Sequence, residues 1–248
     1  MDKREFLQMA NPAAGRRISW EYLADERRSM PPEKFGRERL GWHDRPALGD
    51  APLISRDMWR ALVDPDSTPL DPVSFGVYVN RSQTYSAIGV AGYRADGLFH
   101  VGVVPAVRGD DNALSLPGIG WIPDRVKELV DSWGPCAVVI DERSEAGSLI
   151  TDLQGLGVDV QTTNAAAMAQ ACGRFFAAVR DREIRHQGSR PLEDAVCSAK
   201  RRDLGDAWAW DRRDPDSDIT QLVAVTLALH GLMVHGRPRE TEVWAFWA

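Results

Sequence analysis

Two aspartates, Asp141 and Asp218, have the chemistry and the positions of candidate metal ligands. Asp141 ends the apolar run CAVVID (136 to 141), which is typical of a strand buried on both faces. Asp218 stands at the start of an apolar helix that we expect to run to about Val234. Mg²⁺ and Mn²⁺ prefer oxygen ligands, and two such ions about 4 Å apart can orient a water and stabilise the leaving oxygen of a phosphodiester. We therefore predict two-metal phosphodiester hydrolysis, with Asp141 and Asp218 as catalytic residues and metal ligands.

Each aspartate also has a simpler structural interpretation. Asp141 suits the turn that follows a strand, because its side chain can accept a backbone hydrogen bond. Asp218 suits the N-cap of the last helix, where a carboxylate satisfies unpaired N–H groups. Asp214 and Asp216 are close enough in sequence to take the place of Asp218, so the third ligand is open among these three residues.

The elements that must position these residues form an α/β pattern. Three β-rich runs with short polar breaks predict three consecutive antiparallel strands at 74 to 80, 84 to 94 and 98 to 107. Helices and strands then alternate. The helices are expected at 122 to 133, 147 to 157, 165 to 179 and 191 to 199, and the strands at 136 to 141, 158 to 163 and 183 to 188. The sequence KRRDLGDAWAWDRRD predicts a hairpin before the last helix, with Trp208 and Trp210 covering a core face.

The first part of the chain has a different texture. Residues 1 to 70 hold charged helical stretches broken by seven prolines, and they predict an N-terminal helical linker. Within it, Ser19 is expected to cap a helix through Trp20 and Leu23, and a second helix is expected after Pro31 and Pro32. We expect a main domain over residues 71 to 240 and a C-terminal tail over residues 241 to 248.

Composition limits the classes of protein. The chain has 248 residues, of which 44% are hydrophobic and 27% charged, and these values exclude a disordered chain. The net charge of −6 means that any nucleic-acid surface must be local. Three widely spaced cysteines, no signal sequence and no long apolar run predict a cytoplasmic protein without a membrane span.

A cluster of basic residues lies in the sequence just before Asp218. These residues predict contacts to the phosphates of DNA, because Lys and Arg displace counterions there. Neutralisation by neighbouring aspartates, including Asp203 and Asp206, is the alternative. The residues are Lys200, Arg201, Arg202, Arg212 and Arg213.

Five segments together resemble the nuclease domain of the large terminase subunit of tailed bacteriophages, a ribonuclease H-like domain that cuts genomic DNA during packaging. The segments are NPAAGRRISWEYLADERRSMPPEKFGRERLGWHD (11 to 44), FGVYVNRSQTYSAIGVAG (75 to 92), AVVIDERSEAGSLITDL (137 to 153), MAQACGRFFAAV (168 to 179) and AKRRDLGDAWAWDRRDPDSDITQLVAVTLALHG (199 to 231). The resemblance implies a ribonuclease H-like mixed sheet and a linker that corresponds to the end of the terminase ATPase domain. It also implies a DNA endonuclease in the host cytoplasm, with double-stranded DNA, a portal protein, a small terminase subunit and a separate packaging ATPase as partners.

The sequence departs from this family pattern at two points. It contains no Gly-Lys pair and hence no P-loop, so we expect no ATPase activity in this chain. Tyr78 stands where the family has a metal-binding Asp, and a neutral phenol is a poor ligand for Mg²⁺. Asn80 lies on the same strand face and offers an amide oxygen, while Asp203 and Asp206 are other substitutes.

Two hypotheses of function follow from the departure at Tyr78. The first is a metal-dependent DNA endonuclease that is weakened by the loss of this carboxylate. The alternative is a terminase remnant that binds DNA or packaging partners without cutting. A cellular ribonuclease H-like protein unrelated to phage is a further possibility, because the fold alone does not choose among nucleic-acid enzymes.

Overall fold

The computed structural model describes residues 8–9, 11–30, 34–35, 38–39, 52–110, 114–214 and 217–236. The chain divides into two compact units, Met1–Ala51 and Pro52–Ala248. In the first unit, helix α2 (Trp20–Ser29) begins where Ser19 accepts a hydrogen bond from the backbone N–H of Tyr22, which confirms the predicted cap. The predicted helix after Pro31 falls partly outside the described residues, and the predicted tail over 241 to 248 falls entirely outside them.

The second unit is built on a six-stranded mixed sheet in the order β5-β4-β1-β2-β3-β6. Strands β1, β2 and β3 pair antiparallel in chain order, as predicted, and β4 joins β1 in parallel. Strand β5 pairs in parallel with β4, and β6 pairs in parallel with β3. The strands are β1 (Leu70–Val79), β2 (Ser86–Tyr93), β3 (Phe99–Val104), β4 (Ala137–Asp141), β5 (Val160–Thr163) and β6 (Ile184–Arg185).

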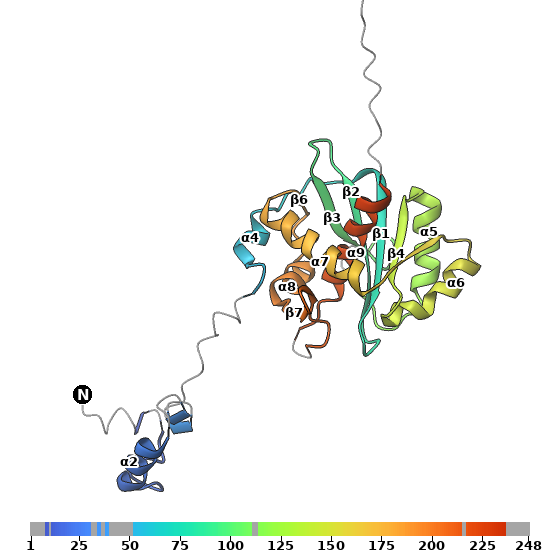
Figure 1. Cartoon of the computed structure of the whole chain (residues 1–248). Helices are drawn as coiled ribbons and strands as arrows, with labels where there is room; N and C mark the ends of the chain where they lie inside the picture. The colour runs from blue at the N-terminus through green and yellow to red at the C-terminus, as the bar shows by residue number, and fades with distance from the viewer. Residues whose placement is uncertain are drawn as a thin grey trace, which may run out of the picture. The chain divides into compact units, whose positions relative to one another are not determined.

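Helices cover both faces of this sheet (Figure 1). One face packs on α5 (Ile122–Trp133), η1 (Glu145–Leu149) and α6 (Ile150–Gly155). On the other face α9 (Thr220–His235) lies against the strands, and α7 (Ala165–Arg180) and α8 (Arg190–Ser198) pack on α9. Side chains of β1 alternate between the two faces, so Phe75 and Val77 join the first core while Tyr78 joins the second.

Helix α9 lies directly on the sheet because glycines leave room for its backbone. Gly76 of β1 pairs with Gly89 of β2, and both lie beneath α9. A Cβ atom on Gly76 would lie 2.3 Å from the carbonyl oxygen of Ala224. Most residues of α9 are buried, since the helix is enclosed by the sheet on one side and by α7 and α8 on the other.

Two smaller features complete the second unit. Helix α4 (Arg56–Arg60) packs on α8, and its Trp59 is fully buried. The hairpin of β7 (Arg201–Leu204) and β8 (Ala207–Trp210) forms a separate two-stranded sheet. Trp210 is fully buried against α7, which confirms that the hairpin tryptophans belong to the core.

The structure differs from the predicted elements at some ends. Strand β6 spans two residues, because the chain after Arg185 turns to exchange backbone hydrogen bonds with Leu62 and Asp64. Helix α9 begins at Thr220, so the prediction that Asp218 is its N-cap is wrong, and Ile219 is the N-cap residue. Among the described helices, none has the length and apolar character that a membrane crossing needs.

Candidate functional site

The candidate site lies at the carboxyl ends of β1 and β4. These strands pair in parallel, and Val77 lies opposite Ile140. The next residue of each strand, Tyr78 and Asp141, therefore lies at the same edge of the sheet. Alternation along both strands directs Tyr78 and Asp141 toward the face covered by α9. Asp141 is buried, with only 2% of its surface exposed, and it also accepts the backbone hydrogen bond of the following turn, as its structural interpretation predicted.

A third residue, Arg212, forms an ion pair with the buried carboxylate. Its Nη1 atom donates to Oδ2 of Asp141 at 2.5 Å. The other carboxylate oxygen, Oδ1, accepts the backbone N–H of Arg143 at 3.1 Å. Both oxygens of Asp141 thus accept hydrogen bonds from protein donors, one of which is a permanent cation.

Tyr78 lies next to this ion pair. The Arg212 guanidinium carbon is 5.8 Å from the centre of the Tyr78 ring. Burial raises the pKa of Tyr78 above its usual value of 10, and the Asp141 carboxylate raises it further, although Arg212 opposes this shift. The phenol is therefore neutral at physiological pH. Burial lowers the pKa of Arg212, but attraction to Tyr78 and Asp141 outweighs it and leaves that pKa raised.

Asp218 reaches the same site from the start of α9. The charge of its carboxylate raises the pKa of Tyr78, as that of Asp141 does, so both predicted aspartates lie near this ring. Its Oδ1 atom accepts the backbone N–H and the hydroxyl of Thr220, at 3.0 and 2.5 Å. This local turn explains why helical geometry begins only after Asp218. Tyr78, Arg212 and Asp218 line one cavity of about 530 Å³.

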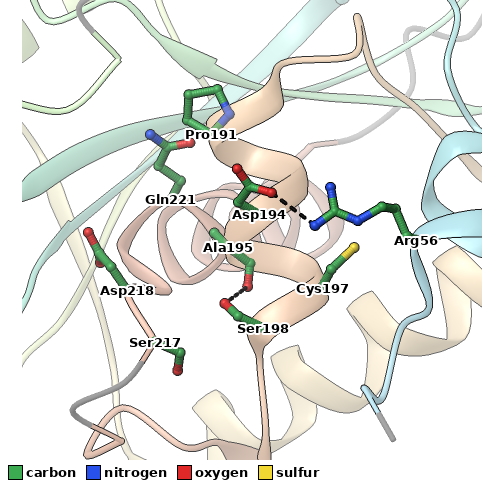
Figure 2. A pocket seen from close by; sticks show the side chains of 9 residues that line it. All are labelled: Arg56, Pro191, Asp194, Ala195, Cys197, Ser198, Ser217, Asp218 and Gln221. Carbon is green, nitrogen blue, oxygen red and sulfur yellow. Dashed lines mark hydrogen bonds and ion pairs between the residues drawn. The ribbon is translucent and has the colours of Figure 1, made fainter.

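A second cavity of about 430 Å³ lies on the other side of Asp218, between α8 and the start of α9 (Figure 2). Ser217, Asp218 and Gln221 form one wall, and α8 forms the other. Among the described residues that line it, the cation is Arg56, which is bound to Asp194 at 3.0 Å. This cavity therefore has no available positive charge for an anion.

The other predicted ligands are used elsewhere or lie apart. The amide oxygen of Asn80 accepts the backbone N–H groups of Thr84 and Tyr85, at 2.9 and 3.2 Å, and so holds the turn between β1 and β2. Asp203 forms an ion pair with Arg201 at 2.8 Å, and Asp206 lies in the exposed turn of the hairpin. Asp214 forms an ion pair with Lys200 at 2.9 Å. Asp216 lies outside the described residues.

These residues do not fit a site for two metal ions. Tyr78 is neutral, and one oxygen of Asp141 is bound to a guanidinium that would repel a divalent cation. Within the described parts of the chain, no group of three or more His, Cys, Asp or Glu side chains is arranged to hold a metal. The site instead holds the guanidinium of Arg212 beside the buried carboxylate of Asp141.

Arg212 and four further arginines line a cavity of about 250 Å³ that Tyr78 also lines. We call it the arginine cavity; its arginines are Arg81, Arg143, Arg202, Arg212 and Arg213. Three of these were predicted from sequence as DNA contacts. The other two predicted contacts, Lys200 and Arg201, are ion-paired with aspartates and do not line the cavity.

Arg81 and Arg143 were not predicted from the sequence. Each stands two residues after the end of a parallel strand, Arg81 after β1 and Arg143 after β4. Ligands of open α/β sheets bind outside the carboxyl ends of such strands. That position is the signal that could have identified both arginines.

Comparison with solved structures places this fold among phage proteins. The HK97 bacteriophage large terminase superposes with a TM-score of 0.56 at 18% sequence identity, over 92% of this chain and 54% of that one. The large terminase nuclease of the thermophilic phage G20c superposes with a TM-score of 0.53 at 12% identity, over 72% of this chain and 97% of that one. The chain has the fold of phage large-terminase nucleases.

The terminase nuclease fold accounts for one part of the HK97 protein, since the chain spans about half of that protein's length. The G20c nuclease was also solved with bound magnesium, and that structure matches with a TM-score of 0.52 at 13% identity, over 74% of this chain and 97% of that one. No family model matches this sequence, and no curated protein matches it. The resemblance to the terminase nuclease is therefore carried by the fold.

Proposed function

We propose that this chain is the nuclease-fold module of a phage DNA-packaging terminase, and that it binds double-stranded DNA without cutting it. The observation that carries this proposal is the ion pair between Asp141 and Arg212 beside the neutral Tyr78. A carboxylate that neutralises a guanidinium is a poor ligand for Mg²⁺, since the metal must displace a charge-assisted hydrogen bond.

DNA binding is supported by the arginine cavity. Its five guanidinium groups gather on a molecule whose net charge is −6, so they form the local basic surface that a polyanion needs. Arginine binds phosphate oxygens in bidentate geometry and remains charged at all physiological pH values.

A plasmid-nicking assay tests the absence of cutting. We expect the wild-type chain to retard supercoiled plasmid in a gel but to leave it uncut in Mg²⁺ or Mn²⁺. The variant Tyr78→Asp returns a carboxylate to β1, and nicking gained by it would indicate a centre that lost activity through this substitution. Circular dichroism of each variant checks that the fold is retained.

Metal-dependent endonuclease activity is the second candidate. It is supported by Asp141 and Asp218, two carboxylates that the sequence predicts to converge and that both raise the pKa of Tyr78. Nicking by the wild-type chain that disappears in Asp141→Asn would establish this candidate and reject the first. The same experiment therefore decides between them.

The packaging role carries further proposals about partners and location. We propose a separate packaging ATPase, a portal protein and a small terminase subunit as its partners. The host cytoplasm is the proposed location. Co-purification from infected cells of an ATPase that contains a P-loop would test this assembly.

A further inference from the structure

We infer that the arginine cavity binds one phosphate group of DNA independently of divalent metal, with Arg212 supplying the positive charge at the centre. This inference deepens the proposed function and rests on it. It assigns Arg81 and Arg143 to the site and gives Asp141 a new role, in which the carboxylate holds the guanidinium of Arg212 in place.

Unpaired positive charge at the cavity favours a bound phosphate. Among the residues that the structure describes, the side chains of Arg81, Arg143, Arg202 and Arg213 have no ion-pair partner, although most arginines of the second unit do. The Nε atom of Arg202 is buried without a hydrogen-bond partner. A buried donor without an acceptor is costly, so an acceptor from a ligand would stabilise it.

The balance of charge around the cavity also favours a bound phosphate. Arg212 is neutralised by Asp141, and among the described residues that line the cavity the acidic one is Glu145. Four guanidinium groups thus face one carboxylate. Like charges in a small space repel one another, and a bound phosphate would relieve this repulsion.

The size of the cavity suits a phosphate group. The cavity has a volume of about 250 Å³, which is below the range of roughly 300–1,000 Å³ of sites for drug-sized ligands. Apart from Tyr78 and Val79, its lining is polar or charged. A phosphate group fits this description better than a base does, because bases need apolar or aromatic faces for stacking.

The position of Arg212 suits contact with a phosphate. It lines both the arginine cavity and the larger cavity next to Asp218. Asp141 fixes one of its N–H groups, and the ring of Tyr78 lies beside the guanidinium. A guanidinium held from one side presents its remaining N–H groups in fixed directions, which suits bidentate contact with a phosphate.

Fluorescence anisotropy of a labelled DNA duplex tests the inference. We expect equal affinity in EDTA and in Mg²⁺ at constant ionic strength. Each of Arg143→Gln and Arg202→Gln should weaken binding about tenfold, the loss of one charged hydrogen bond. Each should also lower the slope of log affinity against log salt by about 1.

The matched control is Arg182→Gln, which removes an exposed arginine from the opposite end of the sheet. Arg182 precedes β6, whose first residue pairs with Phe99 of β3. Phe99 pairs with Tyr93 of β2, and Tyr93 pairs with Leu70, the first residue of β1. Arg182 therefore lies at the end of the sheet where β1 begins, whereas the arginine cavity lies where β1 ends. The control should bind like the wild type. Binding that EDTA abolishes, or cavity variants that bind like this control, would overturn the inference while the proposed function stands.

A second measurement separates the inference from the proposed function if no duplex binds. Line broadening of inorganic phosphate in ³¹P NMR, recorded in EDTA, reports on the cavity alone. Broadening by the wild type that is lost in Arg202→Gln supports the phosphate site and rejects DNA binding. Equal spectra for the two proteins would overturn the site as well.

Discussion

At the scale of single residues, the ion pair of Arg212 and Asp141 sets the charge of the site. Replacing Arg212 by Met leaves a carboxylate that is 2% exposed without its cation. We expect the free energy of unfolding to fall by about 3 kcal/mol, the usual cost of removing one partner of a buried pair. Urea denaturation followed by circular dichroism measures this loss.

A second substitution controls for lost packing. In the double variant Arg212→Met with Asp141→Asn, no unpaired charge remains, and we expect most of the lost stability to return. A double variant as unstable as Arg212→Met would show that the guanidinium acts through packing alone.

His100 makes stability depend on pH. Its pKa is lowered to about 4, chiefly by burial and also by Arg94 and His186, while Asp64 opposes the shift. The unfolded chain therefore binds a proton between pH 6.5 and about 4 that the folded chain does not, and stability is lost as pH falls through this window. We expect a loss of about 3 kcal/mol from this residue between pH 7 and pH 4.

The comparison of two histidine variants checks this pH dependence by urea denaturation at both pH values. His100→Gln should lose less stability on acidification than the wild type. The exposed His235 provides the matched control, and His235→Gln should keep the wild-type dependence. Equal acid sensitivity in all three proteins would contradict the role given to His100.

Sequence patterns found some of these residues but could not find their partners. Asp141 was predictable because it ends an apolar run, and its placement beside Tyr78 follows from strand order. Its ion pair with Arg212 spans 71 positions of sequence. Such a contact depends on how the hairpin of β7 and β8 packs, and no local pattern records that packing.

At the scale of elements, the close approach of α9 to the sheet fixes the site, because α9 brings Asp218 to the ends of the strands. Replacing Gly76 by Ala places a Cβ atom 2.3 Å from the Ala224 carbonyl oxygen and 2.4 Å from the Ala228 nitrogen. We expect a loss of about 3 kcal/mol in unfolding free energy, since neither backbone atom can move freely.

Gly173→Ala is the matched control for this substitution. Gly173 lies within α7, and a Cβ atom there would have no neighbour within 4 Å. It should stabilise the chain by up to about 1 kcal/mol, because Ala favours helix more than Gly does. Urea denaturation of both variants tests whether α9 packs as described, and a tolerated Gly76→Ala would contradict it.

Elements were predictable where hydrophobic periodicity was strong. The three antiparallel strands, α5, β4 and α7 match their predicted positions closely. The ends were harder to predict, because tertiary contacts decide them. Strand β6 ends at Arg185 because the next residue, His186, pairs with Val63. Helix α9 begins only at Thr220 because Asp218 forms a turn with this residue.

At the scale of the whole molecule, the boundary between the two units can be tested by truncation. The sequence predicts a linker over residues 1 to 70, whereas the compact units divide after Ala51. Residues 52 to 70 include the fully buried Trp59, which stacks on His186 at 4.0 Å, and Arg60, which pairs with Glu193 at 2.8 Å.

We expect a chain that begins at Pro52 to unfold at the same urea concentration as the full chain. A chain that begins at Asp71 should lose at least about 3 kcal/mol, the typical cost of removing a buried tryptophan. Equal stability of the two truncated chains would place the boundary at residue 70 instead.

The burial of α9 also has a consequence for biosynthesis. This helix follows every strand of the sheet in chain order, and it covers β1, β2 and β4. A ribosome has therefore made all six strands before the segment that seals their apolar face emerges. Nascent chains that stop short of Thr220 leave this face open to water, which makes them natural clients for chaperones and proteases.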